Sequence, residues 1–322
     1  MRARTVVFWL AVVLLVLPAW ALTAARLTDP SGSVGIALVA LTPFGLPLYG
    51  GALVLAAAAL LRRRRWRTAV LPVAIVAIAG LVVHGWWYAP QVSGAAPPPA
   101  AGTEPTVVMT ANLYFGNADP AAVVDGVRDG DVDLLVVNEV TETSVAGLDA
   151  AGLADLLPHR AGEPAPDGDG TATMAFSREP ISEVSRVPML QDGWLFTTGG
   201  LVVAAVHAFA PNEPDVWRAD HAALAASVAA HEPDLVVGDL NATVDHAPMR
   251  RLAAAGYRDA GELADAGWQP TWPAMRVGRI PGIPLAQIDH VLVGPRLTAL
   301  DQHAVDLPGS DHEGLVAEVA PR

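Results

Sequence analysis

Two short stretches, Leu134-Leu135-Val136-Val137-Asn138-Glu139 and Leu235-Val236-Val237-Gly238-Asp239, decide the fold of this chain. Each begins with a run of aliphatic residues and ends in polar ones. Successive side chains of a strand point to opposite faces, so a strand that is apolar at every position is buried on both faces. Both stretches therefore predict central strands of a sheet that helices or a second sheet cover.

Similar strand-like runs alternate with helical patterns along residues 106–322, and this alternation indicates an α/β domain. The 217 residues of this part are enough for one large domain with a substantial core. The predicted strands lie at 106–113, 133–138, 171–177, 201–208, 234–239, 288–293 and 313–319. The predicted helices lie at 119–129, 142–156, 214–231 and 246–254, and no internal repeat is present.

Polar residues stand at the edges of six of these strands. They are Asn112, Glu139, His207, Asp239 with Asn241, Asp289, and Asp311 with His312. Carboxylates, carboxamides and imidazoles at strand ends are the groups that hold a hard divalent cation against a phosphate. If the strands lie side by side, these groups converge on one rim and indicate metal-assisted phosphoester hydrolysis.

Each of these residues also has a structural explanation when it is taken alone. A carboxamide such as Asn112 often begins a turn, and Glu139 can cap the helix that follows it. The ring of His207 can be satisfied by backbone in the core, and Asp289 or Asp311 can be loop acids. Only the joint order and context of the set lack a structural explanation.

The order and spacing of the motifs resemble the endonuclease/exonuclease/phosphatase superfamily, which includes deoxyribonuclease I-like nucleases, abasic-site endonucleases, neutral sphingomyelinases and inositol-polyphosphate phosphatases. The resemblance covers residues 106–322 and implies a four-layer α/β/β/α sandwich of two mixed sheets. The motifs that carry it are Thr110-Ala111-Asn112-Leu113, Val137-Asn138-Glu139-Val140, Val206-His207, Gly238-Asp239-Leu240-Asn241, Ile288-Asp289-His290-Val291 and Ser310-Asp311-His312.

The resemblance implies a metal site. Glu139 resembles the main carboxylate ligand of a Mg²⁺ or Mn²⁺ ion, with Asn112 and Asp311 completing or supporting the ligand shell. A sparse set of protein oxygens is expected, because Mg²⁺ keeps several waters. The chain departs from the family at Glu313-Gly314, where many members have Arg and then Pro, and this difference concerns local packing and substrate contacts.

The resemblance also implies catalytic roles. Asp239 is expected to orient or deprotonate the attacking water, and Asn241 to steady the charge that develops on phosphorus. His312, oriented by Asp289, is expected to contact the phosphate. His207 is expected to donate a further hydrogen bond to a phosphate oxygen.

The sequence of the first 88 residues predicts a membrane anchor with apolar spans at about 5–24, 34–61 and 68–88. Arg2, Arg4 and the block at 62–67 are basic, so both flanks belong in the cytoplasm, and three spans place everything after Tyr88 outside. Two alternatives remain: a re-entrant pair of half-helices at 34–61, and a cleaved signal peptide at the first span. His84 lies near the outer end of the third span, where we expect headgroup water to solvate it.

Residues 89–105 join the anchor to the domain and contain Pro97-Pro98-Pro99 among Ala, Gly and Ser. This composition cannot form a core and favours extended, semi-stiff conformations. We therefore expect a spacer.

Charge restricts the substrate. The chain has no lysine and no cysteine, and residues 89–322 carry twelve Arg against thirty-two acids. Because proteins that grip DNA offer basic side chains to its phosphates, a small or lipid-borne phosphoester is a better expected substrate than nucleic acid. The alternatives are an extracellular DNA or RNA nuclease and a non-catalytic binding module on the same fold. The lipid bilayer is the expected partner, and the sequence indicates no protein partner.

Overall fold

The structure is a computed structural model that describes residues 2–62, 67–275 and 282–322. The chain divides into two compact units, residues 1–90 and 91–322. Each unit is described by itself below.

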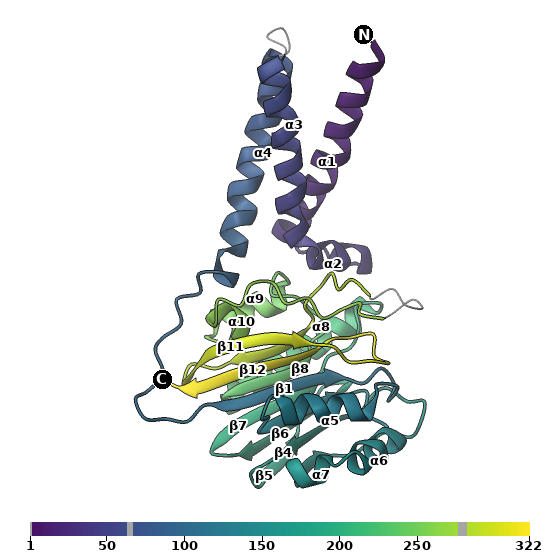
Figure 1. The fold of residues 1–322 in the computed structure, drawn as a ribbon, viewed down its shortest axis with the longest axis vertical. Helices are drawn as coiled ribbons and strands as arrows, with labels where there is room; N and C mark the ends of the chain where they lie inside the picture. Colours follow the sequence, from purple (N-terminus) through teal and green to yellow (C-terminus); the bar gives the residue numbers. More distant parts are fainter. Residues whose placement is uncertain (1, 63–66, 276–281) are drawn as a thin grey trace. The chain divides into compact units, whose positions relative to one another are not determined.

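The N-terminal unit is helical (Figure 1). Its helices are α1 (Arg2–Thr28), α2 (Ser33–Ala40), the 3₁₀ turn η1 (Thr42–Phe44), α3 (Gly45–Arg62), α4 (Arg67–Tyr88) and the 3₁₀ turn η3 (Ala89–Gln91). Among the described residues, three segments are long and apolar enough to cross a membrane: Thr5–Thr28, Thr42–Leu61 and Thr68–Gln91. Residues 63–66 of the predicted basic block lie outside the described residues.

The predicted span at 34–61 is wrong in extent, because the chain breaks near Pro43. Helix α2 ends at Ala40 and α3 begins at Gly45, with Pro43 inside the turn between them. Proline has no backbone N–H and disfavours helical geometry at the residue before it, so it favours the break that is observed there. The segment that can span a membrane is therefore the shorter Thr42–Leu61.

A polar cluster joins the helices of this unit. The Thr23 hydroxyl lies 2.9 Å from the Tyr49 hydroxyl and 2.9 Å from His84 Nε2, and His84 Nδ1 lies 3.0 Å from the Thr42 carbonyl oxygen. His84 is buried, so the expectation that headgroup water solvates it is wrong. Its polar atoms are satisfied within the bundle, as an apolar surrounding requires.

Residues 91–100 begin the second unit and are hydrogen-bonded to the rest of it. The Gly267 N–H donates to the Gln91 carbonyl at 2.8 Å, and Arg258 donates to the Gly94 carbonyl at 2.9 Å. Further along, the Thr298 hydroxyl donates to the Pro97 carbonyl and the Ala100 N–H to that of Pro321, both at 2.8 Å. The expected spacer is extended, but its backbone lies along the domain.

The second unit contains two six-stranded mixed sheets. The first has the order β11-β12-β1-β2-β4-β3 and the second β5-β6-β7-β8-β10-β9. One parallel pair lies inside each sheet, β1 with β2 and β7 with β8, and the other neighbours are antiparallel. The strands are β1 (Thr106–Asn112), β2 (Leu134–Asn138), β3 (His159–Gly162), β4 (Thr173–Ser177), β5 (Ser182–Arg186), β6 (Asp192–Thr198), β7 (Leu201–His207), β8 (Leu235–Asp239), β9 (Arg258–Asp259), β10 (Asp289–Val293), β11 (Leu297–Val305) and β12 (Gly314–Pro321).

Alternate side chains of the central strands fill two separate cores. Val108, Val136 and Val237 belong to the cluster between the sheets, whereas Met109 and Val137 belong to the cluster beneath the first group of helices. The helices are α5 (Pro120–Asp129), α6 (Glu142–Ala150), α7 (Leu153–Leu156), α8 (Pro214–His231), α9 (Ala247–Ala254) and α10 (Ala260–Leu263). Helices α5, α6 and α7 lie on one side and α8 and α9 on the other, so the predicted α/β/β/α sandwich is confirmed (Figure 1). Ala260 and Leu263 of α10 belong to the cluster between the sheets.

All seven predicted strands of the domain form, with ends within two residues of those expected. The predicted helix at 142–156 divides at Gly152, whose φ of 98° is left-handed. Strands β3, β5, β6, β9 and β11 were not predicted. Strand β5 has the sequence SEVSR and is exposed at every position, so it has no apolar alternation to reveal it.

Candidate active site

The predicted site residues meet at one end of both sheets. In the first sheet, Asn112 of β1 stands opposite Asn138 of β2. Glu139 directly follows Asn138 in the chain. In the second sheet Asp239 of β8 stands opposite both His207 of β7 and Asp289 of β10. Because β10 runs antiparallel to β8, its first residue lies where β7 and β8 end. The loop before β12 brings Asp311 and His312 to the same place.

Close packing of the β7 and β8 backbones explains why glycine precedes Asp239. Gly238 has a φ of 137°, and a Cβ atom there would lie 1.9 Å from the Val206 carbonyl oxygen. Only glycine accepts this approach of β7 to β8. The contact keeps His207 and Asp239 on neighbouring strand ends.

Glu139 forms an acidic corner with Asn112 and Asp311. One oxygen of Glu139 accepts from Asn112 Nδ2 at 3.1 Å, and the other accepts from the Phe115 N–H at 2.9 Å. Burial raises the pKa of Glu139, and the negative charge of Asp311 adds to this effect. The φ of Glu139 is 57°, a conformation that is unfavourable outside glycine and is often found at functional sites.

The acidic corner fits a hard cation. Glu139 and Asp311 supply carboxylate oxygens, and Asn112 supplies an amide oxygen that already accepts from the Tyr114 N–H at 2.9 Å. Mg²⁺ and Mn²⁺ take such oxygen ligands, and a cation relieves the repulsion between buried carboxylates. These three residues are the ones that would hold the ion.

A second group with metal-like geometry consists of Asp239, Asp289 and His312, whose ligand atoms lie within 4.8 Å of one another. Its short distance is the hydrogen bond from His312 Nδ1 to Asp289 Oδ2, at 2.8 Å. This bond already accounts for the proximity, and imidazole suits Mg²⁺ poorly as a ligand. We therefore place the cation at the acidic corner and treat this group as an Asp–His pair beside Asp239.

Asp239 links the two sheets. Its Oδ2 accepts from Asn112 Nδ2 at 3.1 Å, and its Oδ1 accepts from the Asn241 N–H at 2.7 Å. Burial and the charge of Asp289 raise the pKa of Asp239 to about 7. A carboxylate with such a pKa can accept a proton near neutral pH.

The two histidines beside Asp239 have opposite protonation preferences. Burial lowers the pKa of His312, but the carboxylates of Asp289, Asp239 and Asp311 outweigh it and raise the pKa to about 10. Burial and the charge of His312 lower the pKa of His207 to about 3. Near neutral pH the site therefore holds one imidazolium and one neutral imidazole, with His207 Nε2 3.6 Å and His312 Nε2 3.8 Å from Asp239 Oδ2.

Asn241 also lies at the site. Its Nδ2 donates to the Ala208 carbonyl at 2.9 Å and lies 3.3 Å from Asp239 Oδ2. Its φ is 46°, and its own carbonyl accepts from Trp217 Nε1 at 2.9 Å. The eight predicted site residues thus come together from both sheets.

Asn138 is a site residue to which the sequence assigned no role. Its Oδ1 accepts from the Asp239 N–H at 2.8 Å, and its Nδ2 donates to the Val206 carbonyl at 3.1 Å. These bonds cross from the first sheet to the second and fix the spacing of Glu139 and Asp239. The strand LLVVN is buried at every position, and a buried amide needs hydrogen-bond partners. An asparagine at the end of such an aliphatic run is therefore the feature of the sequence that could have indicated the role of Asn138.

Three further side chains contact residues of the predicted site. The Ser310 hydroxyl donates to the Asn112 carbonyl at 2.7 Å and accepts from the His312 N–H at 3.0 Å. The Thr271 hydroxyl accepts from the Asp289 N–H at 3.3 Å, and Gln191 Nε2 lies 3.4 Å from His207 Nδ1. These contacts depend on loops, so no periodic pattern revealed them.

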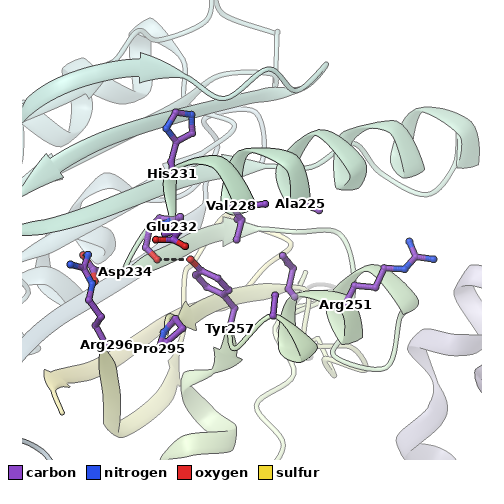
Figure 2. Close-up of a pocket in the computed structure, with 13 residues that line it drawn as sticks. Ala225, Val228, His231, Glu232, Asp234, Arg251, Tyr257, Pro295 and Arg296 are labelled. Atoms are coloured by element: carbon purple, nitrogen blue, oxygen red, sulfur yellow. Dashed lines mark hydrogen bonds and ion pairs between the residues drawn. The ribbon is translucent and has the colours of Figure 1, made fainter.

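A separate surface hollow of about 760 Å³ lies at the opposite end of β8 (Figure 2). It includes Asp234, which precedes β8, whereas Asp239 ends it. Tyr257 donates to the Pro233 carbonyl at 2.9 Å, and Arg296 pairs with Asp234 at 2.7 Å. Burial and the nearby acids raise the pKa of Tyr257 to about 12, so the Tyr257 hydroxyl is not an acid–base group for neutral pH.

Comparison with known families identifies this arrangement. Residues 109–312 match the model of the Endonuclease/Exonuclease/phosphatase family. The chain belongs to this family. The match runs from β1 to His312, so it includes every predicted site residue, and the family's name covers nucleases and phosphatases, which hydrolyse phosphoesters.

Solved structures share the fold of this family member. An endonuclease/exonuclease/phosphatase from Beutenbergia cavernae is 22% identical, with a TM-score of 0.54 over 67% of this chain and 72% of its own. The 3′-5′ exonuclease of Neisseria meningitidis is 19% identical, with a TM-score of 0.52 over 67% of this chain and 100% of its own. An AP endonuclease from Archaeoglobus fulgidus is 14% identical, with a TM-score of 0.52 over 66% and 98%. A search of curated proteins found no match.

Proposed function

We propose that this chain is a divalent-metal-dependent phosphodiesterase or phosphatase, held in a membrane with its catalytic domain outside the cytoplasm. The observation that carries the proposal is the group around Asp239. The Asp239 carboxylate lies 3.6 Å from His207 Nε2 and 3.8 Å from His312 Nε2, with His312 held by Asp289 at 2.8 Å, beside an acidic corner that fits a cation.

In this proposal each residue has one task. Asp239 takes the proton of the attacking water through a carboxylate oxygen, and Asn241 steadies the charge that develops on phosphorus. His312, held by Asp289, places its Nε2–H against one phosphate oxygen, and His207 donates to another. A cation at Glu139 would neutralise negative charge on the phosphate, and the rest of the rate enhancement comes from positioning.

Hydrolysis of bis-p-nitrophenyl phosphate by the full chain tests the proposal. We expect turnover with Mg²⁺ or Mn²⁺, and full activity in excess EDTA would contradict the metal requirement. Asp239→Asn should lower kcat by about 10²–10⁴-fold, the usual contribution of a general base. The matched control is Asp301→Asn, which removes one exposed carboxylate from β11 and should leave turnover unchanged.

The acidity of the domain favours a small or lipid-borne substrate. Residues 89–322 carry twelve Arg and thirty-two acids, so the surface repels a polyanion such as duplex DNA. A panel of DNA, RNA, phospholipids, sphingomyelin and inositol phosphates tests this ranking. Faster turnover of DNA than of every small or lipid ester would replace the proposal with an extracellular nuclease.

The outward placement of the domain rests on the basic flanks Arg2, Arg4 and residues 62–67, which the positive-inside rule assigns to the cytoplasm. A reporter that is active only outside the cytoplasm, fused after Tyr88, should be active. Activity of a cytoplasmic reporter at the same point would contradict the placement.

A further inference from the structure

Four exposed apolar side chains form one patch on the second unit. They are Trp272, Met275, Ile283 and Leu285, with exposed fractions of 42%, 44%, 76% and 38%. We call these four residues the apolar rim. Apolar side chains that gather in this way on a soluble surface mark a site of interaction, whereas single ones need no explanation.

Backbone contacts hold the apolar rim together. The Leu285 N–H donates to the Trp272 carbonyl at 2.8 Å, and Trp272 pairs with Ala286 in an antiparallel bridge. Farther from this bridge, a Cβ atom on Gly282 would lie 2.3 Å from the carbonyl carbon of Ala274. The segments 272–275 and 282–285 therefore run side by side, so their exposed side chains belong to one surface.

The apolar rim borders the candidate active site. Trp272 Nε1 donates to Asp311 Oδ2 at 3.3 Å, and the Ala274 N–H donates to the Asp311 carbonyl at 2.7 Å. Asp311 belongs to the acidic corner. Whatever covers the apolar rim therefore lies beside the residues that would bind the phosphoester.

The chain enters the domain close to the apolar rim. Gln91, which ends the third apolar segment Thr68–Gln91, is bound through its carbonyl by the Gly267 N–H. Gly94 is bound in turn by the Asp265 carboxylate and by Arg258. Gly267 precedes Trp272 by five residues, which reach at most about 17 Å when fully extended. Residues 91–94 are therefore hydrogen-bonded to the part of the domain that precedes the apolar rim.

We propose that the apolar rim rests in the headgroup region of the bilayer that holds the helices, so that the active site opens toward a phosphoester borne by a lipid. The inference rests on the proposed function and adds a substrate class to it. Covalent connection alone keeps residues 91–94 near the membrane if the third segment spans it. Tryptophan and aliphatic side chains are favoured at a membrane–water interface.

Charge supports a bilayer as the occupant. Residues 272–275 and 282–285 contain no charged side chain, although residues 89–322 carry thirty-two acids. Anionic headgroups therefore repel most of the domain more strongly than they repel the apolar rim. A neutral apolar patch beside the tether is the part of the surface best suited to enter a bilayer.

The absence of cysteine allows a direct test in the full chain. A single Ile283→Cys substitution is labelled with an environment-sensitive fluorophore, and the protein is reconstituted in vesicles of phosphatidylethanolamine and phosphatidylglycerol. We expect a blue-shifted emission that nitroxide-bearing lipids quench and aqueous iodide does not. The control is Val184→Cys on β5, a residue with 46% exposure outside the apolar rim, which should show the opposite behaviour. Equal behaviour of the two labels would overturn the inference.

A second copy of the chain is the other possible occupant. The Ile283→Cys label is therefore measured again in nanodiscs that hold one protein each. A blue shift that persists supports insertion into lipid, and a blue shift that disappears overturns it in favour of contact between copies.

The consequence for the substrate is tested with Ile283→Asp and Leu285→Asp together. Turnover of a phospholipid in vesicles, divided by turnover of bis-p-nitrophenyl phosphate, should fall at least about tenfold, because interfacial binding scales with the apolar area buried. An unchanged ratio would overturn the inference. If the unmodified chain hydrolyses neither ester, the proposed function fails, while the fluorescence result still decides whether the apolar rim meets lipid.

Discussion

Two His–Asp pairs in this domain share a strand but differ in their surroundings. His312 lies 2.8 Å from Asp289, and His290 lies 2.6 Å from Asp259. Asp289 and His290 are adjacent in β10, so their side chains point to opposite faces of the sheet. One face leads to the active site and the other to the small helix α10.

The second ring nitrogen distinguishes the pairs. His290 Nε2 lies 2.8 Å from the Ala242 carbonyl, so both nitrogens face acceptors and the ring has no capacity left. His312 Nε2 instead lies 3.8 Å from Asp239 and 3.9 Å from Asp311, beyond the usual length of a hydrogen bond. A histidine whose second nitrogen is still available can act on a substrate, whereas one with both nitrogens bonded serves the fold.

The largest expected effect on stability follows from His290→Ala. The substitution leaves the Asp259 carboxylate buried without its cation, which typically costs about 3–5 kcal/mol of unfolding free energy. Urea unfolding of residues 91–322, which contain both large cores of the domain, measures this loss. The matched control is His303→Ala, which breaks an exposed His–Asp pair and should cost less than about 1 kcal/mol. Equal costs would remove the distinction between buried and exposed pairs.

The next effect is on catalysis. His312→Gln removes the positive donor at the site, so kcat for bis-p-nitrophenyl phosphate should fall by about 10²–10³-fold, as for other transition-state donors. Thermal stability should fall less than with His290→Ala, because glutamine can still donate to Asp289. The control His303→Gln should retain full activity. A loss of folding with His312→Gln would make both pairs structural and contradict the comparison.

The sequence predicted one of these pairs and not the other for a physical reason. Asp289 and His312 each adjoin an apolar strand, so both were visible as polar strand ends, and the family resemblance implied that they pair. Asp259 lies in β9, a strand of two residues with no periodicity, and reaches His290 from 31 positions away. Pairing that depends on such a short edge strand becomes visible only in three dimensions.

Elsewhere in the molecule too, features with a periodic pattern were predicted from the sequence, and contacts that depend on tertiary packing were not. Central strands such as Leu134–Asn138 were predicted because burial on both faces leaves a continuous aliphatic run. The cross-sheet bonds of Asn138 were not, since they depend on how the two sheets stack. Pro43 was visible in the sequence, yet whether it kinks or ends a helix depends on the packing around it.

The smallest expected effect concerns Glu262, which lies beside the structural pair on α10. Burial and the negative charge of Asp259 raise the pKa of Glu262 from 4.5 to about 7. Between these values the folded state binds more protons than the unfolded state, so stability falls as pH rises from 4.5 and the loss is complete above 7. Glu262→Gln removes this loss and should stabilise residues 91–322 by about 1–3 kcal/mol above pH 7.

Urea unfolding of residues 91–322 at a series of pH values measures the effect. The gain from Glu262→Gln should vanish as the pH approaches 4.5, because both states of the parent protein then hold the proton. Glu104→Gln, at an exposed position, should follow the parent at every pH. A gain that did not depend on pH would assign the effect to packing. In that case the negative charge of Glu262 would not affect the stability of the domain around the His290–Asp259 pair.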